Sequence, residues 1–140
     1  MTTAAKRAPG GTLQIVQVWL VTRLLFATIA MAVAITGGRA LETVLTQWDV
    51  AHFLLIAREG YADPREMAFF PGLPLVLRGF ATLGVSPVLA GSALALVSSL
   101  LAAFALKRIA GVWGATAWLL APTAVFTAVA YTEAPFCAAA

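Results

Sequence analysis

Long apolar segments constrain this chain more than any other feature of its sequence. The first covers about residues 13–35. Three more cover about residues 69–84, 88–106 and 112–130, and another begins at 134–140. Of the 140 residues, 61% are hydrophobic and 11% charged, and the mean hydropathy is +0.93. A soluble domain carries about a quarter charged residues, so this surface needs lipid or protein around it. Since a crossing helix needs roughly 20 apolar residues, the pattern predicts an all-α, polytopic membrane protein with about four apolar helices.

The rest of the composition excludes several functional classes. The net charge is +3 and the basic residues form no stripe, so no nucleic-acid partner is expected. The single cysteine, Cys137, excludes an intrachain disulfide and a cysteine-rich metal site. His52 is the only histidine, which excludes a histidine-rich metal site. A metal site made of carboxylates alone is left open but has no support in the sequence, so we expect no metal and no other cofactor.

The N-terminal region indicates how the chain is oriented. Residues 1–12 are polar, with Lys6 and Arg7 as their only charges. The apolar run that follows exceeds the core of a signal peptide, about 7–15 residues, so residues 13–36 are predicted to be an uncleaved first transmembrane helix. Because cytoplasmic flanks carry an excess of Lys and Arg, the N-terminus is predicted to be cytoplasmic. Residues 37–68 then form an extracytoplasmic loop of a multi-pass plasma-membrane protein.

The number of crossings after this loop is an open point. Four full crossings would place Lys107 and Arg108 outside and Glu133 inside. The positive-inside rule favours a cytoplasmic position for Lys107 and Arg108. If Glu133 and Asp49 act in the same reaction, Glu133 must lie on the same side of the membrane as Asp49. One segment that fails to cross satisfies both conditions, and the short segment 69–84 is the best candidate.

The loop is the one long polar-rich stretch of the chain. It contains five of the six acidic residues: Glu42, Asp49, Glu59, Asp63 and Glu66. Residues 48–59 have helical spacing, with Thr46 predicted to cap this helix and Gly60 to end it. The helix is amphipathic and too short to span, so we expect it to lie on the membrane surface with Trp48 and Phe53 as interfacial anchors. Four residues are expected near one face: Asp49, His52, Ile56 and Glu59.

Asp49 is the candidate catalytic base. A carboxylate beside aromatic residues at an apolar surface can accept a proton from a substrate hydroxyl. The structural alternative is an acidic residue that stabilises the start of a helix. His52, one turn later, either orients Asp49, contacts a substrate, or is an interfacial side chain with an ordinary hydrogen bond.

Two charged residues outside the loop are also candidates. Glu133 stands beside Tyr131 after the charge-free stretch 109–132. An acid in or near the membrane points to a functional site, and a loop acid at the water boundary is the alternative. Arg23 interrupts the first span. It either extends to the headgroups or holds the phosphate of a lipid-linked substrate, for which the planar guanidinium is suited.

Several spaced motifs resemble one family of membrane enzymes. The motifs are Trp48-Asp49-x-x-His52-Phe53, Ile56-Ala57-x-x-Gly60-Tyr61, the run 68–74, Pro122-Thr123-x-x-Phe126 and Tyr131-Thr132-Glu133-Ala134-x-Phe136. They resemble the first lumenal loop and the later Ser-Pro and Tyr-Ser-Glu stretches of the PIG-V family, with Ala121 before the proline and Thr132 in place of the serine. That family is the second mannosyltransferase of glycosylphosphatidylinositol anchor assembly, together with its bacterial relatives. Arg23 matches as well, and the resemblance extends from about Leu20 to the end.

The resemblance implies the N-terminal part of a GT-C fold and of a mannosyltransferase. Such an enzyme takes mannose from polyprenyl-phosphate-mannose in the membrane and transfers it to an acceptor hydroxyl on the outer face. A single inverting displacement needs one base, for which Asp49 is the candidate, while Glu133 positions the acceptor or shares the proton transfer. The remaining implied substrate contacts are Trp48, His52 and Tyr131, with Arg23 or Arg78 at the donor phosphate.

The length of the chain leaves alternatives open. Members of the family carry more spans and several hundred residues, so the helices that would complete the donor groove are missing from this match to the N-terminal part. The chain is either a fragment of a longer reading frame or a truncated gene product, and its expected partner is the missing C-terminal part or a membrane protein. The alternative is a non-catalytic multi-span subunit that scaffolds another membrane protein. A proton-coupled carrier that uses Glu133 is a third possibility, but it leaves the loop motif unexplained.

Overall fold

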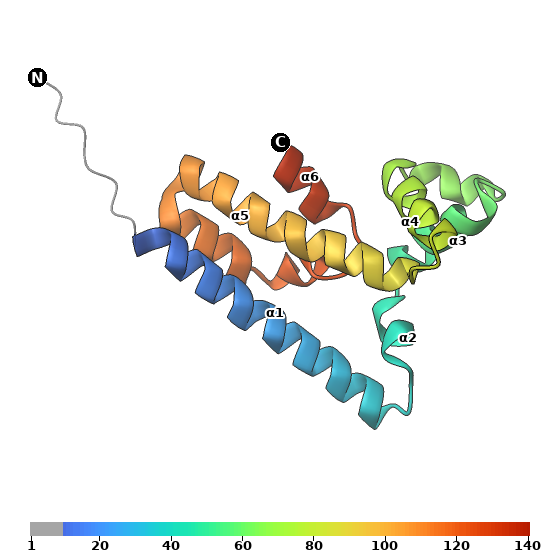
Figure 1. The fold of residues 1–140 in the computed structure, drawn as a ribbon, viewed down its shortest axis with the longest axis horizontal. Coiled ribbons are helices and arrows are strands. Elements are labelled where there is room, and N and C mark those ends of the chain that lie inside the picture. The colour runs from blue at the N-terminus through green and yellow to red at the C-terminus, as the bar shows by residue number, and fades with distance from the viewer. Residues whose placement is uncertain (1–9) are drawn as a thin grey trace, which may run out of the picture.

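The computed structural model describes residues 10–140, which form helices and connecting turns (Figure 1). The elements are α1 (Gly10–Thr36), α2 (Leu41–Leu45), α3 (Asp49–Glu59), the 3-10 helix η1 (Pro64–Ala68), α4 (Gly72–Thr82), α5 (Pro87–Leu120), the 3-10 helix η2 (Pro122–Thr127) and α6 (Glu133–Ala139). The all-α expectation is confirmed. Lys6 and Arg7 of the expected cytoplasmic tail lie outside the described residues.

Helices α1 and α5 are long and apolar enough to cross a membrane. Arg23 is the only charged residue of α1. The two helices are joined by a hydrogen bond in which Trp19 Nε1 donates to Ser99 Oγ at 2.8 Å. Ala95 and Ala102 of α5 are fully buried, as expected where small residues let helices approach closely in lipid.

Helix α5 turns back on itself at Gly111, whose φ of 73° and ψ of −177° are not helical. Glycine adopts a positive φ readily because it has no Cβ. Ala103 and Ala115, on either side of the bend, belong to one buried cluster with Ile15 of α1. Figure 1 shows the segment after the bend running back beside the first part of α5. Residues 87–110 alone extend roughly 36 Å at 1.5 Å per residue, which suffices for a hydrocarbon core about 30 Å thick.

Two of the four expected apolar segments are not helices of spanning length. In the segment 69–84, α4 has 11 residues and is roughly 16 Å long, too short to cross. It packs through the fully buried Leu77 into the cluster that α3 and α5 share. The segment 112–130 is α-helical only to Leu120, because Pro122 lacks the N–H that would continue the helix. The described part of the chain thus has two helices of spanning length rather than about four.

The expected outer loop forms a helical layer at one end of α5, where Figure 1 shows α3 and α4 side by side. The helix expected over residues 48–59 forms as α3, and Gly60 ends it with a φ of 79°. One face of α3 packs into the buried cluster through Val50, Phe53 and Leu54. The same cluster contains Leu77 of α4 and Val88 of α5. Burial within the protein therefore holds this helix, and its place on a membrane surface stays a prediction.

Two details expected of this loop are wrong. Thr46 does not cap α3, because its hydroxyl donates to Thr43 O at 3.2 Å and Trp48 occupies the N-cap position. Phe53 is only 4% exposed, so it is a core residue and not an interfacial anchor. Ile56 is also buried, whereas Asp49, His52 and Glu59 are exposed.

The two ends of the first part of α5, residues 87–110, differ in charge. Near Gly111, Lys107 Nζ donates to Thr12 Oγ1 at 2.6 Å, which brings the basic pair Lys107-Arg108 to the N-terminal end of α1. At the other end, Ser86 Oγ donates to Glu42 Oε1 at 2.7 Å and ties α2 to the start of α5. The basic pair and the acidic loop therefore lie at opposite ends of the helix.

Candidate active site

An open cleft of about 780 Å³ lies where α3, the start of α4 and the start of α6 meet. Both candidate carboxylates, Asp49 and Glu133, line it although they are far apart in the sequence. Other lining residues come from the aromatic turn before α4, from α4, from the segment around Tyr131 and from α6: Phe69, Phe70, Leu73, Thr132 and Phe136. The cleft thus has an apolar wall with two acidic groups at its edge.

Asp49 owes its position to an unusual backbone conformation in the preceding residue. Trp48 has a φ of 53° and a ψ of −127°, and it is the one non-glycine residue with a positive φ in the described range 10–140. Such a conformation costs about 1–3 kcal/mol and persists only where the surrounding structure enforces it. It makes Asp49 the first residue of α3, with an exposed carboxylate that also faces the favourable end of the helix dipole.

Tyr131 connects the two acidic segments. Its side chain is 6% exposed, and its hydroxyl oxygen accepts the backbone N–H of Asp49 at 3.3 Å. Its ring packs against Phe126 with 5.2 Å between centroids and edge-to-face against Phe53 at 6.3 Å. Glu133, two residues further, begins α6 with an exposed carboxylate. The phenol therefore fixes the segment that carries Glu133 against the first turn of α3.

Burial raises the pKa of Tyr131 above 10.0, while the N–H of Asp49 opposes this by stabilising the phenolate. The negative charges of Asp49 and Glu133 raise the pKa further, as expected of two carboxylates close to one phenol. At neutral pH the phenol is therefore protonated. It can donate a hydrogen bond into the cleft while it accepts the N–H of Asp49.

We expect Tyr131 to ionise later than an ordinary tyrosine, and this can be measured from phenolate absorbance in the 140-residue chain, which has two tyrosines. Because the pKa of Tyr131 is raised in the folded state, its contribution to the free energy of unfolding is complete below the pKa of about 10 in the unfolded chain. This contribution is lost as the pH rises through the pKa in the folded state. Tyr131→Phe should remove the late absorbance change of this phenol, and Tyr61→Phe should retain it. If Tyr131→Phe removed an absorbance change at a lower pH than that of an ordinary tyrosine, the raised pKa of Tyr131 would be contradicted.

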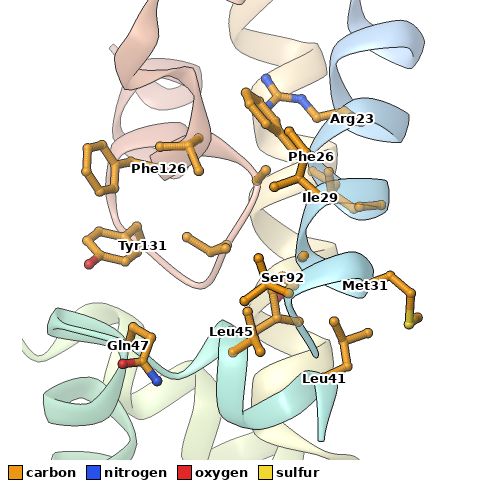
Figure 2. A pocket seen from close by; sticks show the side chains of 18 of the residues that line it. Arg23, Phe26, Ile29, Met31, Leu41, Leu45, Gln47, Ser92, Phe126 and Tyr131 are labelled. Carbon is orange, nitrogen blue, oxygen red and sulfur yellow. The ribbon is translucent and has the colours of Figure 1, made fainter. Parts of the chain in front are cut away.

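A second cavity, about 670 Å³ and mostly apolar, lies between α1, α2 and the η2 segment (Figure 2). Arg23 is at one end of it and Gln47 at the other, with Phe26, Ile29 and Leu45 between them. Trp48 and Tyr131 also line this cavity. Tyr131 thus separates the apolar cavity from the acidic cleft.

The sequence model of the family described as "Mannosyltransferase (PIG-V)" matches residues 18–138. The chain belongs to the PIG-V mannosyltransferase family. GPI alpha-1,6-mannosyltransferase 2 of Homo sapiens is 33% identical over 111 residues, which cover 66% of this chain and 22% of the human protein. The protein of the same name from Cricetulus griseus is 34% identical with the same coverage. The chain spans about a fifth of the length of these relatives, and no solved structure matches it.

The region matched to the PIG-V family includes every residue predicted for the site, but the structure does not bring all of them together. His52 lies beside the cleft and stacks on Phe69, with centroids 5.0 Å apart and planes at 19°. Trp48 is 74% exposed and meets the edge of Phe126 at 6.4 Å. Arg78 is exposed on α4 and lines neither cavity. A role for Arg78 at a phosphate stays a prediction.

Arg23 lies apart from the carboxylates, in the apolar cavity. Only 7% of its side chain is exposed, so it does not extend to the headgroups in this structure. Instead it donates to Ala124 O and to Thr127 Oγ1, each at 2.9 Å. Sequence reasoning missed Thr127, because a threonine in an apolar segment carries no signal until its partner, about a hundred positions earlier, is known.

No group of three or more His, Cys, Asp and Glu residues that could hold a metal ion occurs within residues 10–140. The cleft brings together the carboxylates of Asp49 and Glu133 and the phenol of Tyr131. Two acidic groups on an aromatic cleft suit the binding of a sugar and the removal of a proton from a hydroxyl.

Proposed function

We propose that this chain is the N-terminal part of an integral-membrane mannosyltransferase that uses polyprenyl-phosphate-mannose. The observation that carries the proposal is that Asp49 and Glu133 line one cleft in a member of the PIG-V family. The relatives are named GPI alpha-1,6-mannosyltransferases, which supports mannose as the sugar. The acceptor is proposed only as a hydroxyl group.

In the proposed reaction, Asp49 is the general base. Its carboxylate takes the proton of the acceptor hydroxyl as the oxygen attacks the anomeric carbon of mannose. The bond between that carbon and the phosphate oxygen breaks, and polyprenyl phosphate leaves with the electron pair. One displacement inverts the anomeric configuration. Glu133 would hold the acceptor or share the proton transfer, and neither step needs a metal or another cofactor.

The aromatic wall and the phenol support this assignment. Sugar rings present C–H faces that pack on aromatic side chains such as Phe69 and Phe70, which line the cleft. Tyr131 can donate a hydrogen bond to a sugar hydroxyl or to the phosphate oxygen. Trp48 and His52, next to the cleft, are the proposed further contacts of the substrate.

We propose an orientation in which Lys107 and Arg108 face the cytoplasm and the cleft faces outward at the plasma membrane. This follows from the positive-inside rule and from the opposite positions of the basic pair and the acidic loop along α5. In this arrangement α4 stays on the outer side, so Asp49 and Glu133 share one compartment. The lipid part of the donor would remain in the bilayer.

The test is transfer of radiolabelled mannose from polyprenyl-phosphate-mannose in isolated membranes. The membranes would contain the 140-residue chain, the longest open reading frame that includes it, or neither. Transfer above background with the longest form supports the proposal. Absence of transfer with every form, despite normal expression, would instead favour a non-catalytic subunit that binds another membrane protein.

A further inference from the structure

Arg23 closes a small hydrogen-bonded ring inside the protein. Its Nη1 donates to Ala124 O and its Nη2 to Thr127 Oγ1, both at 2.9 Å. The Thr127 hydroxyl in turn donates to Ala124 O at 2.7 Å. All three residues are at most 7% exposed. We call this arrangement of Arg23, Ala124 and Thr127 the arginine clasp.

The clasp lies where the backbone leaves α-helical geometry. The η2 segment follows the end of α5, and its carbonyl groups are not all used by a continuous helix. Non-helical backbone at membrane depth is tolerated only where protein groups satisfy it. A guanidinium suits this position, because it offers several donors in one plane and its charge is favourable near the C-terminal end of a helix.

A short chain of contacts runs from the clasp to the carboxylates. Phe126, next to Thr127, packs on Tyr131 with 5.2 Å between ring centroids and on Trp48 at 6.4 Å. The Tyr131 hydroxyl accepts the N–H of Asp49. A shift of η2 would therefore move the Tyr131–Glu133 segment relative to α3.

We propose that Arg23 is a positioning residue, whose clasp on η2 holds Tyr131 and Glu133 opposite Asp49. This inference rests on the proposed function. It gives Arg23 a role different from that of a ligand of the donor phosphate. Its two terminal nitrogens are already used by protein acceptors, and Nε is buried with no acceptor among residues 10–140. A phosphate would have to reach Nε or the one N–H that each terminal nitrogen keeps free, so the donor KM is part of the test.

The experiment is a double-mutant cycle in the longest open reading frame. Arg23→Gln, Thr127→Val and their combination would be compared for kcat and for KM of polyprenyl-phosphate-mannose, per amount of folded protein. We expect each single variant to lower kcat by about 10- to 100-fold, since small misplacements of reacting groups have effects of this size. The double variant should be no worse than Arg23→Gln, the donor KM should stay within about twofold, and Arg23→Lys should recover part of kcat.

Thr28→Val is the matched control, because Thr28 is an exposed threonine of α1 that donates only to Leu24 O. It should leave kcat and KM unchanged. A donor KM at least tenfold higher with kcat retained in Arg23→Gln would overturn the proposal in favour of a phosphate ligand. Additive losses in the cycle, or normal kcat with only less folded protein, would also overturn it.

Failure of the proposed function gives a different result. In that case the unmodified long form transfers no mannose. The clasp is then tested by the midpoint of thermal unfolding in detergent for the four proteins of the cycle, which are the unmodified protein, the two single variants and the double variant. Non-additive decreases support the contact between Arg23 and Thr127, whereas additive decreases overturn it.

Discussion

Replacing Asp49 with asparagine is expected to reduce mannose transfer by about 10²- to 10⁴-fold, the usual contribution of a general base. Asparagine keeps the size of the side chain, but it cannot take a proton from the acceptor. The loss of charge next to the helix dipole should lower stability by only about 0.3–1 kcal/mol. The measurement is the initial rate of transfer in the longest open reading frame, normalised to folded protein.

Glu59→Gln is the matched control for this change. Glu59 is another exposed acid, at the opposite end of α3, and it does not line the cleft. Transfer by Glu59→Gln should equal that of the unmodified protein. Normal transfer by Asp49→Asn would remove Asp49 from the mechanism. Equal losses in both variants would point to the total charge of the loop rather than to a base.

Any side chain at Gly91 is expected to destabilise the fold. A Cβ at this position would lie 2.6 Å from Cβ of Ala130 and 2.9 Å from Cδ2 of Leu77. Both distances are shorter than real contacts, so α5 would have to separate from α4 and from the segment before Tyr131. We expect Gly91→Ala to cost about 1–3 kcal/mol, as overpacking does in a close-packed core. Gly91→Val should cost more.

The effect of Gly91→Ala would appear as a lower midpoint of thermal unfolding in detergent, with reduced transfer because Tyr131 is displaced. Gly79→Ala is the control, since a Cβ there would meet nothing within 4 Å. Alanine is the better helix former by about 1 kcal/mol, so Gly79→Ala should be neutral or stabilising. An unchanged midpoint in Gly91→Ala would show that α5 does not pack this closely.

Local sequence signals predicted the elements that depend on local chemistry. The helix over residues 48–59 followed from its spacing, and Gly60 ends it because glycine accepts a positive φ. Pro122 is a local signal of the same kind, because it lacks the N–H that would continue the helix, and η2 begins there. The PIG-V resemblance was recognised from spaced motifs, and the match over residues 18–138 confirms it.

Features that depend on long-range packing could not be predicted in this way. The reversal of α5 at Gly111 places Ala115 beside Ile15, a contact that periodicity does not reveal. Phe53 was predicted to be an interfacial anchor, and its burial could not be foreseen because it depends on Leu77 and Val88, which come later in the chain. The same holds for the bond between Asp49 and Tyr131, whose partners are 82 positions apart.

Cross-linking between positions 49 and 133 tests most directly whether the two carboxylates share one cleft. Asp49→Cys and Glu133→Cys would be combined in a Cys137→Ala background, which removes the single native cysteine, and treated in membranes with a short bifunctional maleimide. We expect rapid cross-linking of this pair and none when Lys107→Cys, next to the bend of α5 at Gly111, replaces Glu133→Cys. Absence of cross-linking between 49 and 133, with both cysteines reacting singly, would contradict the shared cleft.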